Sequence, residues 1–174
     1  YGIHLGQEDL DALSAEDLGQ LRASGLRLGV STHGYAEMVR ADKVSPSYIA
    51  MGAVYPTTLK KMATAPQGVA RLAAYARLLR GYPQVGIGGI DAVRLPEVLA
   101  TGVGSVAVVR ALVAAEDPEA TAAQWMASIA AATSHDRERH EIHRPFAPRP
   151  RLDDLAEEAW PEARLGERCG RHAR

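Results

Sequence analysis

Hydroxyl and lysine side chains gather in one loop of this sequence, at Thr57, Thr58 and Lys60. They follow the apolar run 48–51, which has the length and content of a buried parallel strand. In α/β proteins, anions bind at the carboxyl ends of such strands. Three donors on one loop suit a phosphate or pyrophosphate, to which lysine adds a point charge. The competing interpretation is a solvated surface loop, and for the neighbouring Lys61 it is the stronger one.

Two adjacent glycines form a second candidate anion site. Gly88 and Gly89 follow the strand-like run 84–87. Because glycine has no side chain, its backbone N–H can approach an anion closely. A tight turn from strand to helix needs the same two glycines, so both interpretations stay open. Arg110 follows the strand-like run 105–109 in a comparable position.

Carboxylate, hydroxyl and imidazole groups follow two earlier strand-like runs. Asp9 could hold Mg²⁺, which binds few carboxylates and leaves room for phosphate oxygens, or it could cap the helix that follows. Ser31 and Thr32 could hydrogen-bond a ligand, and His33 could transfer a proton near neutral pH. For Ser31, Thr32 and His33, the competing interpretation is that they cap the helix that follows.

Strand-like and helical patterns alternate along the chain. The strands are expected at 2–5, 26–31, 48–52, 84–87 and 105–109. The helices are expected within 9–23, 35–40, 67–79, 92–100 and 120–132. This alternation predicts an α/β fold with a parallel sheet and right-handed crossovers.

Two architectures would satisfy this pattern, an open doubly wound sheet and part of a (βα)8 TIM barrel. We favour the barrel, because polar or glycine-rich residues follow every strand and a barrel collects such loops at one mouth. The pattern has five strands, so the first three βα units of a barrel would be missing. We expect residues 1–133 to form this barrel portion and residues 134–174 to be a disordered or weakly helical tail.

Composition restricts the function classes. A chain of 174 residues with 47% hydrophobic content and a net charge of -1 indicates one globular domain without general attraction to nucleic acid or membrane. Cys169 is the only cysteine, so no intrachain disulfide can form and a reducing cytoplasm is expected. His140 and His143 have a spacing that could chelate a metal, but a solvated tail is the preferred interpretation.

Five segments in order resemble the thiamine phosphate synthase family. They are HLGQEDL (4–10), RLGVSTH (27–33), YIAMGAVYPTTLKKMATAPQG (48–68), GIGGI (86–90) and GVGSVAVV (102–109). The resemblance implies a TIM barrel that joins a hydroxymethylpyrimidine diphosphate to a thiazole phosphate, releasing pyrophosphate and giving thiamine phosphate. It implies small-molecule substrates and Mg²⁺ as cofactor.

The same resemblance assigns roles by matching positions. Asp9 matches a Mg²⁺ ligand, Ser31 a contact to the pyrimidine, and Lys60 the lysine on the pyrimidine diphosphate, where metal and lysine stabilise the departing pyrophosphate. The thiazole-phosphate site is expected to contain Thr57, Thr58, Leu59, Gly89, Val109 and Arg110. Leu59 stands where the family commonly has a second threonine, and Arg110 stands where a serine is common.

Two parts of the family pattern have no counterpart here: a glutamine–arginine–lysine segment and an asparagine–aspartate pair with the second Mg²⁺ ligand. We therefore expect the isolated chain to be nearly inactive as a synthase. One alternative is the related thiazole tautomerase, in which a histidine placed like His33 acts as base. Asp9 and Lys60 argue against it, because a tautomerase needs neither. The other alternative is a non-catalytic remnant.

Overall fold

A computed structural model describes residues 1–59 and 64–139 of the chain. The strands are β1 (Gly2–Leu5), β2 (Arg27–Thr32), β3 (Tyr48–Met51), β4 (Gln84–Ile87) and β5 (Ser105–Ala107). The helices are α1 (Gln7–Ala12), α2 (Ala15–Ala23), α3 (Tyr35–Lys43), α4 (Gly68–Leu78), α5 (Leu95–Leu99), α6 (Arg110–Val113) and α7 (Pro118–Arg139). The predicted α/β class is confirmed.

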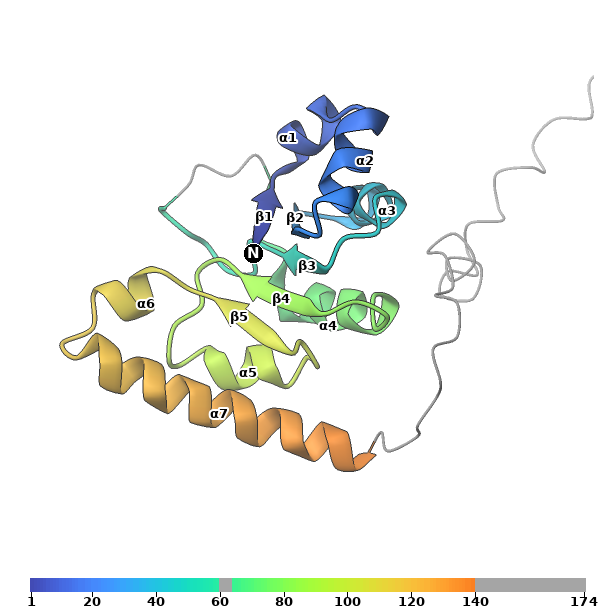
Figure 1. Cartoon of the computed structure of the whole chain (residues 1–174). Helices are drawn as coiled ribbons and strands as arrows, with labels where there is room; N and C mark the ends of the chain where they lie inside the picture. Colours follow the sequence, from blue (N-terminus) through green and yellow to red (C-terminus); the bar gives the residue numbers. More distant parts are fainter. Residues whose placement is uncertain (60–63, 140–174) are drawn as a thin grey trace, which may run out of the picture.

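The five strands form one parallel sheet in the order β1-β2-β3-β4-β5 (Figure 1). Each strand pairs with the next strand in the sequence, so the order never reverses. A doubly wound sheet needs such a reversal at its switch point. All strands are parallel, so the loops that follow them leave from one edge of the sheet. The predicted site residues lie mainly on these loops.

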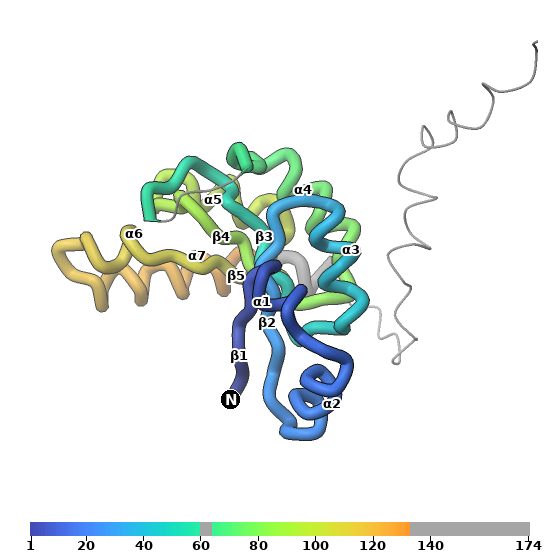
Figure 2. Tube along the Cα trace, turned by 90° about the horizontal axis from the view of Figure 1, so that it is seen from above, coloured from blue at the N-terminus to red at the C-terminus, as the bar shows by residue number. Residues whose placement is uncertain are grey.

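The two faces of the sheet differ in character. One face packs the buried side chains of Val30, Ile49 and Met51 against the helices, where Leu72 of α4 and Val98 of α5 complete the core. Figure 2 shows α3, α4 and α5 following one another around the strands. Burying each such side chain contributes roughly 1.5–3 kcal/mol.

The other face carries small or polar residues on β1, β2 and β3, and the aliphatic side chains of Val85 and Ile87 on β4. Strand pairing places His4 beside Gly29 and Gly29 beside Tyr48, while Ser31 pairs with Ala50 two residues further along. None of these side chains is large and aliphatic. The part of this face formed by β1, β2 and β3 therefore offers hydrogen-bonding groups rather than aliphatic packing.

The prediction of a single helix within 9–23 is wrong. This segment contains two helices, α1 and α2, which are separated by Leu13 and Ser14. The Ser14 hydroxyl accepts the Asp17 N–H at 3.1 Å, and the Asp17 carboxylate accepts the Ser14 N–H at 2.9 Å. This reciprocal capping starts α2 at Ala15. A serine followed three residues later by aspartate was the sequence signal for the break.

Other boundaries differ from the prediction as well, and β2 lies at Arg27–Thr32 rather than at 26–31. Helix α5 is shorter than 92–100, and β5 ends at Ala107 because the short α6, which the pattern did not predict, begins at Arg110. The predicted helix start at Asp117-Pro118 is confirmed, since Asp117 accepts the Ala120 N–H at 2.9 Å. Helix α7 continues to Arg139, past the expected boundary at residue 133, so the helical pattern extends further than predicted.

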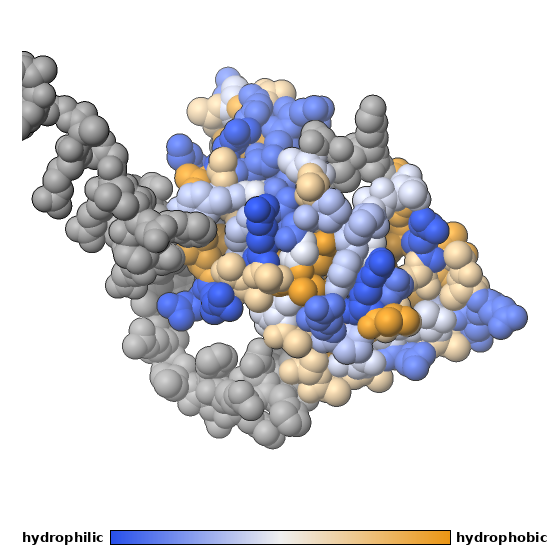
Figure 3. Space-filling view, turned by 180° about the vertical axis from the view of Figure 1, so that it is seen from behind, coloured by the Kyte–Doolittle hydropathy of each residue, from blue (hydrophilic) through white to orange (hydrophobic). Residues whose placement is uncertain are grey.

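The surface is mixed in polarity. On the face seen in Figure 3, hydrophobic residues stand in small groups between hydrophilic ones. Among the helices of the described residues, none combines the length and apolarity needed to cross a membrane. His140, His143 and Cys169 lie outside the described residues.

Candidate functional site

Thr58 in the loop after β3 contacts Arg110, which follows β5. Both residues were predicted to bind the same phosphate. The Arg110 guanidinium donates a hydrogen bond from Nη1 to the Thr58 hydroxyl oxygen at 2.7 Å, although the residues are 52 positions apart. Both residues are exposed. A guanidinium and a hydroxyl held together in this way can bind the same anion.

The glycine turn after β4 packs against the beginning of the same β3 loop. The backbone N–H groups of Val54 and Tyr55 donate to the carbonyl oxygens of Ile87 and Gly88 at 2.9 and 3.0 Å. A β-carbon at Gly89 would lie 2.5 Å from the Pro56 carbonyl oxygen. Since Gly89 also has a φ of +64°, both conformation and contact require glycine there.

The remaining residues of the predicted phosphate loop are also accessible. The Thr57 hydroxyl oxygen accepts the Leu59 N–H at 3.3 Å, so its own O–H stays able to donate. Leu59 is 58% exposed and Val109 is 54% exposed. Lys60, for which we predicted the pyrophosphate contact, lies outside the described residues.

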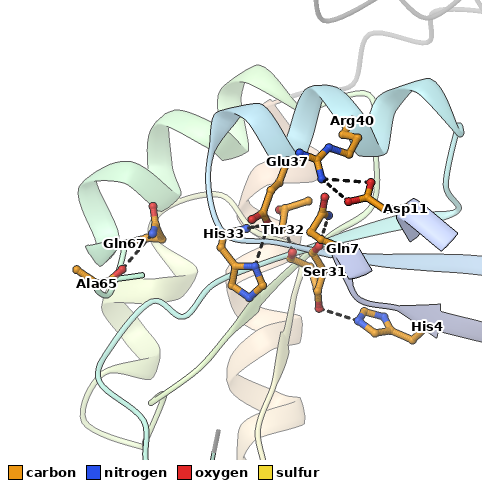
Figure 4. A network of polar contacts seen from close by, with 11 residues as sticks. His4, Gln7, Asp11, Ser31, Thr32, His33, Glu37, Arg40, Ala65 and Gln67 are labelled. Atoms are coloured by element: carbon orange, nitrogen blue, oxygen red, sulfur yellow. Dashed lines mark hydrogen bonds and ion pairs between the residues drawn. The ribbon is translucent and has the colours of Figure 1, made fainter. Parts of the chain in front are cut away.

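A second polar cluster lies on the face of the sheet that carries His4, Gly29 and Ser31, which we call the open face. The His4 ring contacts the Tyr48 hydroxyl through Nδ1 at 2.7 Å and the Ser31 hydroxyl through Nε2 at 2.8 Å. Figure 4 shows His4 and Ser31 directed toward each other. The Tyr48 ring reaches His4 by crossing Gly29, where a β-carbon would collide with the ring.

Burial lowers the pKa of His4, which favours the neutral imidazole. A neutral imidazole has one donor and one acceptor, and these match its two hydroxyl partners. The Ser31 backbone is also held, because the Gln7 side-chain amide donates to its carbonyl oxygen at 2.7 Å. Ser31 is thus fixed from two sides, with its hydroxyl on the open face.

Asp9 occupies the third position of α1, where its carboxylate accepts the Gly6 N–H at 3.1 Å. This contact supports the helix-capping interpretation. Within residues 1–59 and 64–139, no three His, Cys, Asp or Glu side chains form a group able to hold a metal ion. Asp9 thus offers a single exposed carboxylate.

Ser31, Thr32 and His33 are adjacent in sequence, but each side chain has a different hydrogen-bond partner. Thr32 is buried on the opposite side, and its hydroxyl donates to the Ala50 carbonyl oxygen at 3.1 Å, so a ligand role for Thr32 is wrong. Both the His33 backbone N–H and its Nδ1 contact the Glu37 carboxylate, at 2.7 and 2.8 Å (Figure 4). The N-cap of α3 is Gly34, so none of the three caps this helix as expected.

Sequence reasoning missed His4, Tyr48 and Gln7 as parts of the Ser31 cluster. His4 stands in a segment whose pattern indicates only a strand followed by a candidate metal ligand. A signal was present in the alternation of the strands, since His4 and Ser31 occupy positions that face the same side once the register is known. Register is set by the sheet, so the pairing itself was not visible in the sequence.

Comparison with known proteins identifies relatives of the chain. A family model described as thiamine monophosphate synthase matches residues 1–112. The chain is 54% identical over 127 residues to the thiamine-phosphate synthase of Neisseria meningitidis serogroup A, which covers 73% of this chain and 60% of that protein. It is 55% identical over 126 residues to the thiamine-phosphate synthase of Salmonella schwarzengrund, covering 72% and 58%.

A solved structure gives the same result. The thiamine phosphate pyrophosphorylase from Pyrococcus furiosus superposes with a TM-score of 0.64 and 29% identity, over 75% of this chain and 60% of that one. The chain thus spans about 60% of the length of the relatives it matches.

Proposed function

The chain belongs to the thiamine monophosphate synthase family, and from this premise we propose that it acts in joining a hydroxymethylpyrimidine diphosphate to a thiazole phosphate. The products are thiamine phosphate and pyrophosphate. One observation carries the proposal: Arg110 and Thr58, both assigned to the thiazole phosphate from sequence, are hydrogen-bonded to each other across 52 residues.

The thiazole phosphate would bind where the loops after β3, β4 and β5 adjoin. Thr57 and Thr58 supply hydroxyl groups, and Gly89 supplies a backbone N–H. Arg110 adds a positive charge at this position, where the family commonly has serine. A phosphate bound here fixes the distal end of the thiazole, so that its ring nitrogen can be held in line with the carbon it attacks.

The pyrimidine would contact the Ser31 hydroxyl. Because His4 and Gln7 hold this residue at its side chain and its backbone, the hydroxyl keeps one direction during the reaction. The neutral state of His4 lets the Ser31 hydroxyl act either as donor or as acceptor toward a pyrimidine ring nitrogen or amino group. Ser31 therefore orients the ring from which the diphosphate leaves.

We also propose that the sheet is part of a closed barrel. The unreversed strand order supports this, because each strand of such a barrel pairs with the next strand along the chain. The barrel portion would extend from residue 1 to the end of α7 at Arg139, in a protein of the cytoplasm that acts on small molecules.

Mg²⁺ and Lys60 belong to the proposal as groups that act on the pyrophosphate. Mg²⁺ would supply charge neutralisation of the leaving group, and Asp9 is the ligand that this chain offers it.

A thiazole tautomerase is the second candidate. The contact between His33 and Glu37 favours it, because a carboxylate that orients a histidine is typical of general bases. The two functions differ in their ligands. A synthase binds the pyrimidine diphosphate in a Mg²⁺-dependent manner, while a tautomerase does not bind it and converts the thiazole tautomer without metal.

Calorimetric titration of the 174-residue chain tests the proposal. We expect it to bind thiazole phosphate, and to bind the pyrimidine diphosphate more tightly with Mg²⁺ than with EDTA. Binding of thiazole phosphate together with turnover of its tautomer, and no affinity for the pyrimidine diphosphate, would favour the tautomerase. No binding of either substrate would overturn both functions and support a remnant.

A further inference from the structure

Three successive peptide groups of the glycine turn are held through their carbonyl oxygens. The oxygens of Ile87 and Gly88 accept the backbone N–H groups of Val54 and Tyr55 at 2.9 and 3.0 Å. The oxygen of Gly89 has a different partner, since it accepts Nη1 of Arg94 at 2.7 Å. Main-chain contacts thus fix the first two groups, and one side chain fixes the third.

A fixed carbonyl also fixes the N–H that follows it. The peptide group is planar, and in its trans form the C=O and the N–H point in opposite directions. Tyr55 therefore sets the direction of the Gly89 N–H, and Arg94 sets that of the Ile90 N–H. In the described part of the chain, neither of these two N–H groups donates to a protein acceptor. Backbone donors without partners are uncommon, and adjacent ones suit an anion.

Arg94 is held in place by three contacts, and the first is its hydrogen bond to the Gly89 carbonyl oxygen. The other two are with Tyr55 and Asp91. Its guanidinium carbon lies 4.6 Å from the centre of the Tyr55 ring, and its Nη1 lies 3.4 Å from the Asp91 carboxylate. The Tyr55 hydroxyl donates to Glu97 at 2.9 Å, which anchors the ring that supports the guanidinium. Arg94 thus connects the β3 loop, the glycine turn and the start of α5.

We propose that Arg94 is a positioning residue, which directs the Ile90 N–H, together with that of Gly89, toward the phosphate of the thiazole substrate. The inference rests on the proposed function, because it assumes that this turn binds phosphate. Arg94 acts through the Gly89 carbonyl and does not touch the ligand. Neither composition nor the motif at 86–90 pointed to it, since arginine four residues after the motif has no anion-binding signature of its own.

The role depends on geometry as well as charge. A guanidinium can donate to the Gly89 oxygen while it stacks on the Tyr55 ring, whereas a lysine ammonium is a compact charge without a planar surface. Arg94→Lys therefore separates the two contributions. Arg40 provides a matched control, because its guanidinium also forms an ion pair with a nearby carboxylate, Asp11 at 3.0 Å, and it is similarly exposed.

The test is calorimetric titration of the 174-residue chain and its variants with thiazole phosphate. We expect Arg94→Ala to weaken binding roughly tenfold or more, the effect of losing one hydrogen bond to a charged group. Arg94→Lys should lose most of the same affinity, and Arg40→Ala should bind like the unaltered chain. Amide NMR adds a readout that stability alone would not move: the Ile90 N–H should shift on ligand addition in the unaltered chain and much less in Arg94→Lys.

The outcomes are distinguishable. Unchanged affinity in Arg94→Ala would overturn the inference, and so would full recovery in Arg94→Lys, which would reduce the role to charge. If Arg94→Ala does not fold by circular dichroism, Arg94→Lys decides the question. If the unaltered chain does not bind thiazole phosphate, the proposed function fails, and the inference fails with it.

Discussion

Replacing Gly89 by alanine should damage both the fold and the phosphate site. An alanine at a φ of +64° costs roughly 1–2 kcal/mol in left-handed backbone conformation. Its β-carbon would also lie 2.5 Å from the Pro56 carbonyl oxygen and 2.8 Å from the Tyr55 β-carbon, and such overpacking costs about 1–3 kcal/mol. We therefore expect the free energy of unfolding to fall by roughly 2–5 kcal/mol in urea titrations.

Gly102→Ala separates the two contributions. Gly102 also has a positive φ, +89°, but a β-carbon there would meet no atom within 4 Å. Its loss of stability should be only the conformational part, about 1–2 kcal/mol, with thiazole-phosphate affinity unchanged. If the two variants lose equal stability, the close approach between the glycine turn and the β3 loop does not exist as described.

Three further predictions concern other parts of the chain. Gly29→Ala should separate the Tyr48 ring from His4, so the proton resonances of the His4 ring should lose the ring-current shift caused by the stacked tyrosine. Because the folded-state pKa of His4 lies below the 6.5 of an unperturbed side chain, the unfolded chain binds more protons in that range. The contribution of His4 to stability should be complete above pH 6.5 and decline as the pH falls below it, and His4→Gln should flatten this dependence in urea titrations at several pH values. Ser14→Ala should cost about 1 kcal/mol in the same assay through loss of the α2 cap, with ligand affinity unchanged.

Strand positions could be predicted to within two residues at each end, because the strands are short segments rich in apolar residues between polar or glycine-containing ones. The runs 2–5 and 84–87 correspond to β1 and β4 without adjustment. Helices were harder where apolar residues continued across a break. The pattern within 9–23 kept its leucines through the Ser14 cap, so periodicity alone joined two helices into one.

The site could be predicted only in part, because its contacts join residues that are distant in sequence. Thr58 and Arg110 were assigned to one ligand by family resemblance, while their hydrogen bond depends on how the β3 and β5 loops fold over the sheet edge. The partner of Ser31 was not foreseen, since it depends on the register of β1 against β2. The role of Asp9 remained open, and its contact with Gly6 favours the cap.

The most direct test of the account is amide and arginine-side-chain NMR of the chain during titration with thiazole phosphate. We expect the largest shift changes at the Gly89 and Ile90 amides, at Thr57 and Thr58, and at the Arg110 side chain. Changes limited to residues away from these three loops, or no saturable changes at all, would show that the loops after β3, β4 and β5 do not form one phosphate site.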